Sequence, residues 1–175
     1  LEDISYERSK CYISNRPLKN FNLDLVYLDS IEDPTNYALL EIVNYLKIIA
    51  DKLNNKNIYI KFHPSSTKKQ NQDFLSKINS LGIKDIQFLK YDSSKKENKI
   101  FIGYSTSGLF TLKSKLSISL VNLIEQENFK WFSKFIGVDQ KEYINNLYTF
   151  FKKPANFLMP YSKENLKKEF SNRLM

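Results

Sequence analysis

Short apolar runs alternate with segments of helical periodicity along most of this chain, and this alternation constrains the fold more than any other feature. The runs cover residues 23–28, 57–62, 86–89, 99–102 and 117–123, and each has the length of a strand. Apolar residues recur at helical spacing from 39 to 53, and again from 74 to 81, before Gly82. Strands alternating with helices predict an α/β fold, a Rossmann-like parallel sheet with helices on both faces.

The remaining boundaries are expected at recognisable residues. Asp33 followed by Pro34 is predicted to cap and begin the first helix. A short helix is expected over 105–112. From Glu125 onward the pattern is helical, with Phe129, Phe132 and Phe135 expected in the core and Ser162 capping the last segment.

The length of 175 residues suits one domain, which we expect over residues 23–175, after an N-terminal extension or interdomain linker over 1–22. No apolar stretch approaches the roughly 20 residues that span a bilayer. The single cysteine, Cys11, excludes an internal disulfide framework and allows a reducing compartment, so a cytoplasmic location is expected. The chain begins at Leu1, and whether another domain precedes it stays open.

The formal net charge of +8 favours anionic partners. The lysines are scattered as pairs at 68–69, 95–96, 152–153 and 167–168, and no RNA-binding or DNA-binding module surrounds them. We therefore expect no nucleic-acid partner. A solvated basic surface is one interpretation, and peripheral contact with the anionic inner face of a bacterial plasma membrane is the other.

Polar residues follow four of the predicted strands, at 29–33, 63–66, 105–107 and 122–125. Ligands of open parallel sheets bind beyond the carboxyl ends of the strands. Because parallel strands share that edge, these four segments are expected to converge there. The candidate functional residues are therefore sought among them.

His63 is the only histidine of the chain. Pro64 fixes the turn after it, and Ser65 and Ser66 come next. Imidazole titrates near neutral pH, so His63 could protonate or hydrogen-bond a leaving phosphate. The alternative is a strand-end histidine that binds backbone groups, and at least one of the two serines is expected to cap the following helix.

Ser105, Thr106 and Ser107 supply three hydroxyls between Gly103 and Gly108. Hydroxyls and backbone amides at a helix start can bind phosphate, because the helix dipole favours an anion there. A simple cap needs one hydroxyl, so three favour a phosphate site. No lysine follows the second glycine, which argues against a Walker loop.

Carboxylates near the end of the first strand are candidates for a general base. Asp33 is chosen by its position, and Asp29 and Glu32 are the alternatives. Asn122 and Glu125 follow the fifth strand and could bond the hydroxyls of a ribose or a sugar. The sequence contains no Asp-x-Asp pair and no cluster of histidines and cysteines, so no metal site is predicted.

The segments 58–65 (IYIKFHPS) and 101–107 (FIGYSTS) together resemble the His-Pro motif and the serine motif of bacterial sialyltransferases. Glycosyltransferase family 52, the lipooligosaccharide and capsule sialyltransferases, is the family that the chain resembles, over roughly residues 23–125. Bacterial polysialyltransferases and the CDP-glycerol polymerases of teichoic acid synthesis have similar elements. The order and spacing of the two motifs make the pair moderately specific.

This resemblance implies the C-terminal, nucleotide-binding half of a GT-B enzyme that transfers sialic acid from CMP-sialic acid, with inversion, to a cell-surface glycan. By match to the motifs, His63 would contact or protonate the leaving phosphate, Pro64 and Ser65 would belong to the donor site, and the hydroxyls at 105–107 would hold the phosphate. No cofactor is implied beyond the donor substrate, and no motif identifies the base.

Two other functions stay open. One is a CDP-glycerol or other CDP-alcohol glycerophosphotransferase, which uses related chemistry. The other is a non-catalytic module that binds a nucleotide or a partner. The oligomeric state is equally open, with a homodimer among the alternatives.

Overall fold

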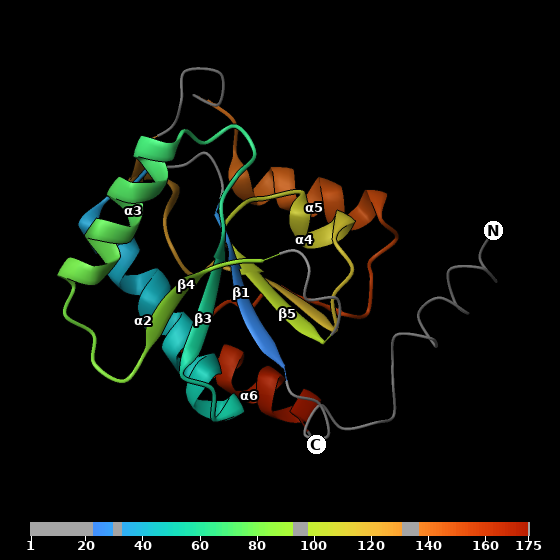
Figure 1. Cartoon of the computed structure of the whole chain (residues 1–175). Helices are drawn as coiled ribbons and strands as arrows, with labels where there is room; N and C mark the ends of the chain where they lie inside the picture. Colours follow the sequence, from blue (N-terminus) through green and yellow to red (C-terminus); the bar gives the residue numbers. More distant parts are fainter. Residues whose placement is uncertain (1–22, 30–32, 93–97, 131–136, 175) are drawn as a thin grey trace.

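A computed structural model describes residues 23–29, 33–92, 98–130 and 137–174 (Figure 1). The predicted extension over 1–22 lies outside these residues, and so do Glu32, Phe132 and Phe135. Within the described residues, no helix combines the length and the apolar character needed to cross a membrane.

The described residues form a six-stranded sheet in which all neighbouring strands are parallel. The strand order β4-β3-β1-β5-β6-β8 is the Rossmann order 3-2-1-4-5-6 when the strands are counted along the chain. The predicted fold class is therefore confirmed. The strands are β1 (Asp24–Leu28), β3 (Asn57–Lys61), β4 (Gln87–Lys90), β5 (Lys99–Gly103), β6 (Leu116–Ser119) and β8 (Phe157–Leu158).

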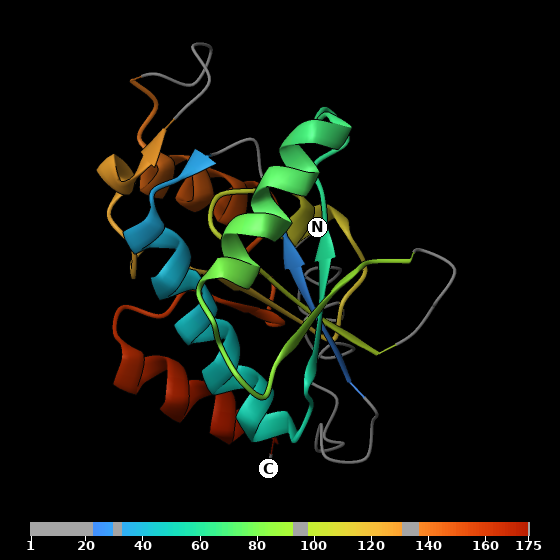
Figure 2. The ribbon, with the colours of Figure 1, turned by 60° about the vertical axis from the view of Figure 1, so that its left-hand side comes forward.

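Helices cover both faces of this sheet (Figure 2). Right-handed crossovers place the helices of the two halves on opposite faces, because the strand order runs outward from β1 in one direction and from β5 in the other. The first face carries α2 (Asn36–Leu53), α3 (Lys68–Ser80) and α6 (Lys163–Leu174). The second carries α4 (Gly108–Thr111) and α5 (Gln140–Phe150).

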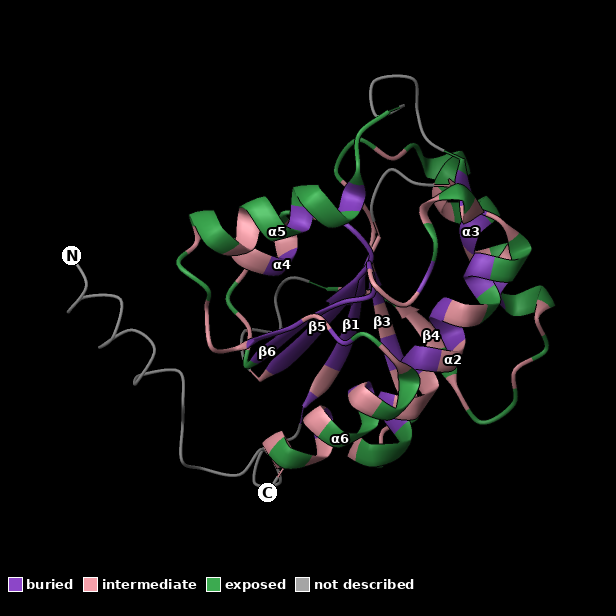
Figure 3. Ribbon diagram, turned by 180° about the vertical axis from the view of Figure 1, so that it is seen from behind, coloured by how far each residue is buried: buried purple, intermediate pink, exposed green. Residues whose placement is uncertain are grey.

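The central strands form the buried core (Figure 3). Every residue of β5 and β6 is buried, including Lys99, Ser117 and Ser119, because helices cover both sides of central parallel strands. The face of α2 that packs on the sheet is equally apolar, with Leu39, Ile42 and Ile49 almost fully buried.

The first helix begins two residues later than predicted. Thr35 is its N-cap, with a hydroxyl that accepts a hydrogen bond from the amide of Ala38 at 3.2 Å. The predicted cap, Asp33, instead lies in β2 (Asp33–Pro34), which pairs antiparallel with β7 (Phe129–Lys130). The ring of a proline disfavours the helical conformation of the residue before it, so Pro34 favours the extended backbone at Asp33.

The helical prediction from Glu125 onward is wrong for its first part. A short 3-10 helix, η2 (Gln126–Asn128), leads directly into β7, and the next helix among the described residues is α5. The ring of Phe129 stacks on Tyr104 at a centroid distance of 4.0 Å, and this contact uses an extended segment instead of a helix. The fifth predicted strand is also shorter than expected, because the chain turns after Ser119.

Two other boundaries are confirmed. The backbone of Gly82 after α3 has a φ of +62°, a conformation that favours glycine. The Ser162 hydroxyl accepts a hydrogen bond from the amide of Asn165 at 3.0 Å and so caps α6.

Candidate functional site

The candidate site lies at the carboxyl edge of the sheet, where the strand order reverses between β1 and β5. Leu28, the last residue of β1, is in register with Lys61 of β3 on one side and with Gly103 of β5 on the other. The segments that follow these strands therefore start at the same edge. The predicted convergence is confirmed for them and for the segment after β6, whose Leu120 amide bonds the Gly103 carbonyl at 2.9 Å.

Gly103 allows the turn after β5 to pack directly against the end of β1. A Cβ atom at this position would lie 3.1 Å from the carbonyl oxygen of Leu28 and 3.0 Å from Cγ2 of Thr106. A larger residue would therefore push the serine segment away from β1. The first glycine of the motif thus has a packing function.

His63 is partly buried, and its imidazole has a defined hydrogen bond. Nδ1 accepts from the amide of Ser65 at 3.1 Å, which leaves the ring proton of neutral imidazole on Nε2. Pro64 and Ser65 are exposed in the turn. The predicted helix cap at Ser65 or Ser66 is wrong, because Thr67 caps α3 in a capping box with Gln70.

Asp29 follows β1 directly and lies beside the start of the His63 turn. Its amide donates to the Lys61 carbonyl at 3.0 Å, and its carboxyl group lies near the backbone amide of His63. Burial raises the pKa of Asp29 from 3.8 to about 7, although the His63 amide acts in the opposite direction. In the sequence, only its position after a buried strand makes Asp29 a candidate for the base. Its raised pKa depends on burial in the folded protein.

Asp33, the predicted base, is engaged elsewhere. Its Oδ1 lies 2.8 Å from Nζ of Lys77 on α3, in an ion pair with about half-exposed side chains (48% for Asp33). This carboxylate joins the β2 segment to α3. The choice of Asp33 as the base rested on its position after the first strand, and Asp29 fits that position better.

The three hydroxyls after β5 have different surroundings. Ser105 is buried, and its hydroxyl donates to Oε1 of Gln140 at 2.7 Å. The Thr106 hydroxyl accepts from the amide of Gly108 at 3.2 Å. Ser107 is exposed and makes no side-chain cap bond. The predicted helix over 105–112 is reduced to the single turn of α4, so phosphate binding by this segment stays a prediction and Ser107 is its best-placed hydroxyl.

The two residues predicted after the fifth strand lie in the turn and loop that follow β6. Asn122 is partly buried. Glu125 is exposed, with Oε2 at 3.9 Å from Nζ of Lys141. Contact of either residue with a sugar hydroxyl stays a prediction. Sequence reasoning missed Gln140, because its partner Ser105 lies 35 residues away in the chain.

In comparisons with known proteins, no family model, curated protein or solved structure matches the chain. Across the described residues, no group of three or more His, Cys, Asp or Glu side chains is arranged to hold a metal ion. The fold and the side chains at its carboxyl edge are therefore the features that bear on function.

Proposed function

We propose that this chain is the nucleotide-binding half of a glycosyltransferase that transfers sialic acid from CMP-sialic acid to a cell-surface glycan with inversion. The observation that carries this proposal is that Asp29 and His63 lie just after the adjacent parallel strands β1 and β3, at the carboxyl edge where the strand order reverses. Nucleotides bind at that point in sheets of this order. We choose CMP-sialic acid as the donor because the His-Pro and serine motifs resemble those of bacterial sialyltransferases.

His63 acts on the leaving group in this proposal. Its Nδ1 accepts from the Ser65 amide, so the ring proton of neutral imidazole is on Nε2, the atom that would donate to the phosphate of departing CMP. A hydrogen bond or a proton given to that phosphate stabilises the charge that develops as the glycosidic bond breaks. The exposed Ser107 hydroxyl contributes a second donor to the same phosphate.

Asp29 is the general base in this proposal. A carboxylate removes the proton of the acceptor hydroxyl as that oxygen attacks the anomeric carbon from the opposite side of the sugar. A base is most effective when its pKa lies near the working pH, and the pKa of about 7 meets this condition. The acceptor itself would be held by the other half of a GT-B enzyme.

A thermal-shift panel of CMP, CDP, UDP, GDP and ATP tests the donor. CMP at 100 times its dissociation constant should add about 2.7 kcal/mol to the free energy of unfolding, more than the other nucleotides at equal concentration. Ser107→Ala should weaken CMP binding roughly tenfold to a hundredfold. A preference for CDP would favour the CDP-alcohol transferase, and equal shifts would leave a general phosphate site.

Transfer by the full-length enzyme tests the two catalytic assignments. His63→Ala and Asp29→Asn should each lower kcat by about a hundredfold to ten-thousandfold while CMP binding falls much less. Asp33→Asn is the matched control, because it removes a carboxylate from the same region without touching His63. Loss of transfer in Asp33→Asn together with full activity in Asp29→Asn would reverse the assignment.

A further inference from the structure

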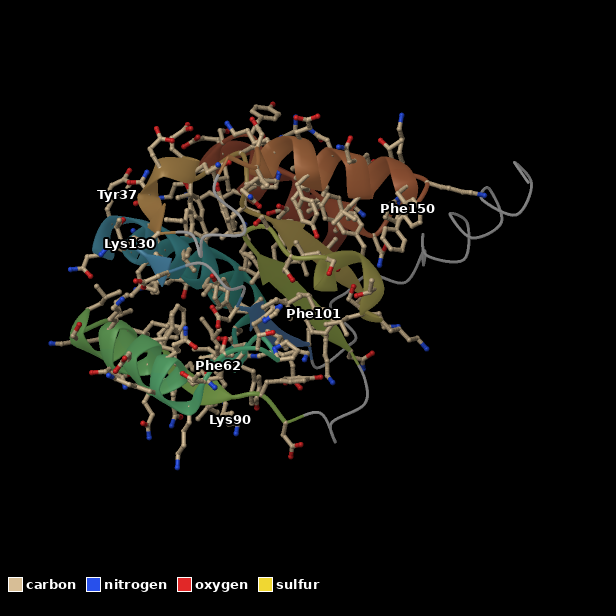
Figure 4. The ribbon with its side chains drawn as sticks, turned by 90° about the horizontal axis from the view of Figure 1, so that it is seen from above. Tyr37, Phe62, Lys90, Phe101, Lys130 and Phe150 are labelled. Atoms are coloured by element: carbon tan, nitrogen blue, oxygen red, sulfur yellow. The ribbon has the colours of Figure 1, made fainter. Side chains whose placement is uncertain are left out.

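The C-terminal end of α5 presents an exposed aromatic ring next to exposed lysines, in a part of the molecule that the proposed site does not use. Phe150 is 77% exposed, and Figure 4 shows it at the end of this helix. Lys152 and Lys153 follow directly, and both are exposed. Exposed apolar side chains beside cations are typical of surfaces that contact lipid headgroups.

A stack of buried and partly buried rings supports Phe150 from below. Its ring packs edge to face on Phe151 at a centroid distance of 5.2 Å. Phe151 stacks on Phe110 of α4 at 5.5 Å, and Phe110 stacks on Phe157 at 4.5 Å. The exposed Phe150 ring therefore projects from a packed cluster of aromatic side chains.

The turn after α4 adds a third lysine to this surface. The amide of Ser117 donates to the Asn156 carbonyl at 2.8 Å, and the Asn156 side chain donates to the Ser114 carbonyl at 3.4 Å. These bonds hold the turn at 113–115 alongside the turn at 152–156. Phe150, Lys113, Lys152 and Lys153 together are called the lysine–phenylalanine patch.

The segments that form this patch contain no acidic residue. Asp and Glu are absent from 98–124 and from 143–163. Arg173 reaches the same turn from α6 and donates to the Ala155 carbonyl at 2.7 Å. Its charge is opposed by Glu169, so we leave it out of the patch. The patch is thus complementary in charge to an anionic surface.

The backbone at the two consecutive lysines is unusual. Lys152 has a φ of 57° and Lys153 a φ of 52°, in the left-handed region that favours glycine. The Lys153 amide closes the helix end with a 2.7 Å bond to the Tyr148 carbonyl. Glycine would be the less strained residue at such a helix end, so the two charges are present at an energetic cost.

We propose that the lysine–phenylalanine patch binds the headgroup layer of an anionic lipid bilayer, with Phe150 entering the interface and the lysines contacting the headgroups. A nucleic acid is the less suitable anion, because single strands are bound by several stacking rings along a basic groove and this patch presents one projecting ring. The proposal does not depend on the transferase function of the chain.

Cosedimentation of the 175-residue chain with phosphatidylcholine vesicles, with and without phosphatidylglycerol, tests the proposal. Binding should require the anionic lipid and weaken at high salt. Lys152→Asn combined with Lys153→Asn should lower the partition coefficient by roughly 25-fold, about fivefold for each lysine. Asparagine tolerates the left-handed backbone, so the variant should keep the Tm of the parent, and a loss of binding cannot be attributed to unfolding.

Lys167→Gln combined with Lys168→Gln is the matched control, because it removes the same charge from α6 on the other face of the sheet. This control should bind vesicles within about twofold of the parent. Phe150→Ser should lower binding with the Tm unchanged. Equal losses in the patch and control variants, equal binding to neutral vesicles, or RNA binding through the patch without vesicle binding would each overturn the proposal.

Discussion

At the scale of single residues, the local surroundings set the tautomer of His63 and the pKa of Asp29. The Ser65 amide donates to Nδ1 of His63, which places the ring proton of neutral imidazole on Nε2. Burial raises the pKa of Asp29 to about 7, although the nearby His63 amide acts in the opposite direction. An aspartate in ordinary surroundings titrates near pH 4, so the fold moves the titration of Asp29 toward neutral pH.

Asp29→Asn should stabilise the protein at neutral and higher pH. The folded pKa is raised, so the folded state holds a proton that the unfolded state loses near pH 4, and wild-type stability falls as pH rises from about 4 to about 7. Asparagine carries no charge and avoids this loss. The gain in the free energy of unfolding should be small at pH 4 and grow toward pH 8, reaching on the order of a few kcal/mol at most. Thermal unfolding from pH 4 to 8 measures it, and a gain that is independent of pH would contradict the raised pKa.

At the scale of elements, a network of hydrogen bonds, buried at Ser105 and Gln140, holds the serine segment against the start of α5. Ser105 donates to Gln140, whose amide donates to Oε1 of Gln126 at 2.8 Å. The side-chain amides of Gln126 and Gln140 both donate to the Val138 carbonyl. The segment after β5 is therefore positioned by the segment after β6, and the position of Ser107 depends on both.

Ser105→Ala should destabilise the protein and Ser107→Ala should not. Removing the Ser105 hydroxyl leaves the buried Oε1 of Gln140 without this donor, which costs about 1 to 3 kcal/mol. Ser107 is exposed, so its replacement should change stability by less than about 0.5 kcal/mol. Urea unfolding of both variants measures the difference. Equal stability of the two variants would show that the Gln140 bond contributes nothing.

At the scale of the whole molecule, β8 and α6 add a strand to the sheet and a helix to the core. β8 adds the last strand beside β6, and α6 packs on α2, where Nζ of Lys52 donates to the Ser171 hydroxyl at 2.7 Å. Leu166 and Phe170 of α6 are fully buried. The last helix thus covers the same face of the sheet as the first, and the two halves of the Rossmann order share one core.

Phe170→Ala should cost about 3 to 5 kcal/mol, because it opens a cavity in that shared core. Phe150→Ala is the matched comparison, since it removes the same side chain from a position that is 77% exposed. Its cost should stay below about 0.5 kcal/mol. Chemical denaturation followed by circular dichroism measures both, and similar values for the two variants would show that α6 is not part of the cooperative core.

The sequence by itself determined the α/β class, the strands β1, β3, β4 and β5, and the common edge at which His63 and the serine segment lie. These features follow from local patterns: continuous apolar runs report burial on both faces, and parallel strands must share their carboxyl edge. The strands β2, β7 and β8 have two residues each, too few to show any periodicity, and they were not predicted.

Only the tertiary structure decided which polar groups meet. Asp33 pairs with Lys77 at a separation of 44 residues, and Ser105 pairs with Gln140 at a separation of 35. The raised pKa of Asp29 likewise depends on its burial in the folded chain. A local sequence pattern indicates whether a residue faces the core. A hydrogen bond or a shifted pKa depends instead on distances of a few ångströms. Strand register and helix packing fix those distances only when the whole chain has folded.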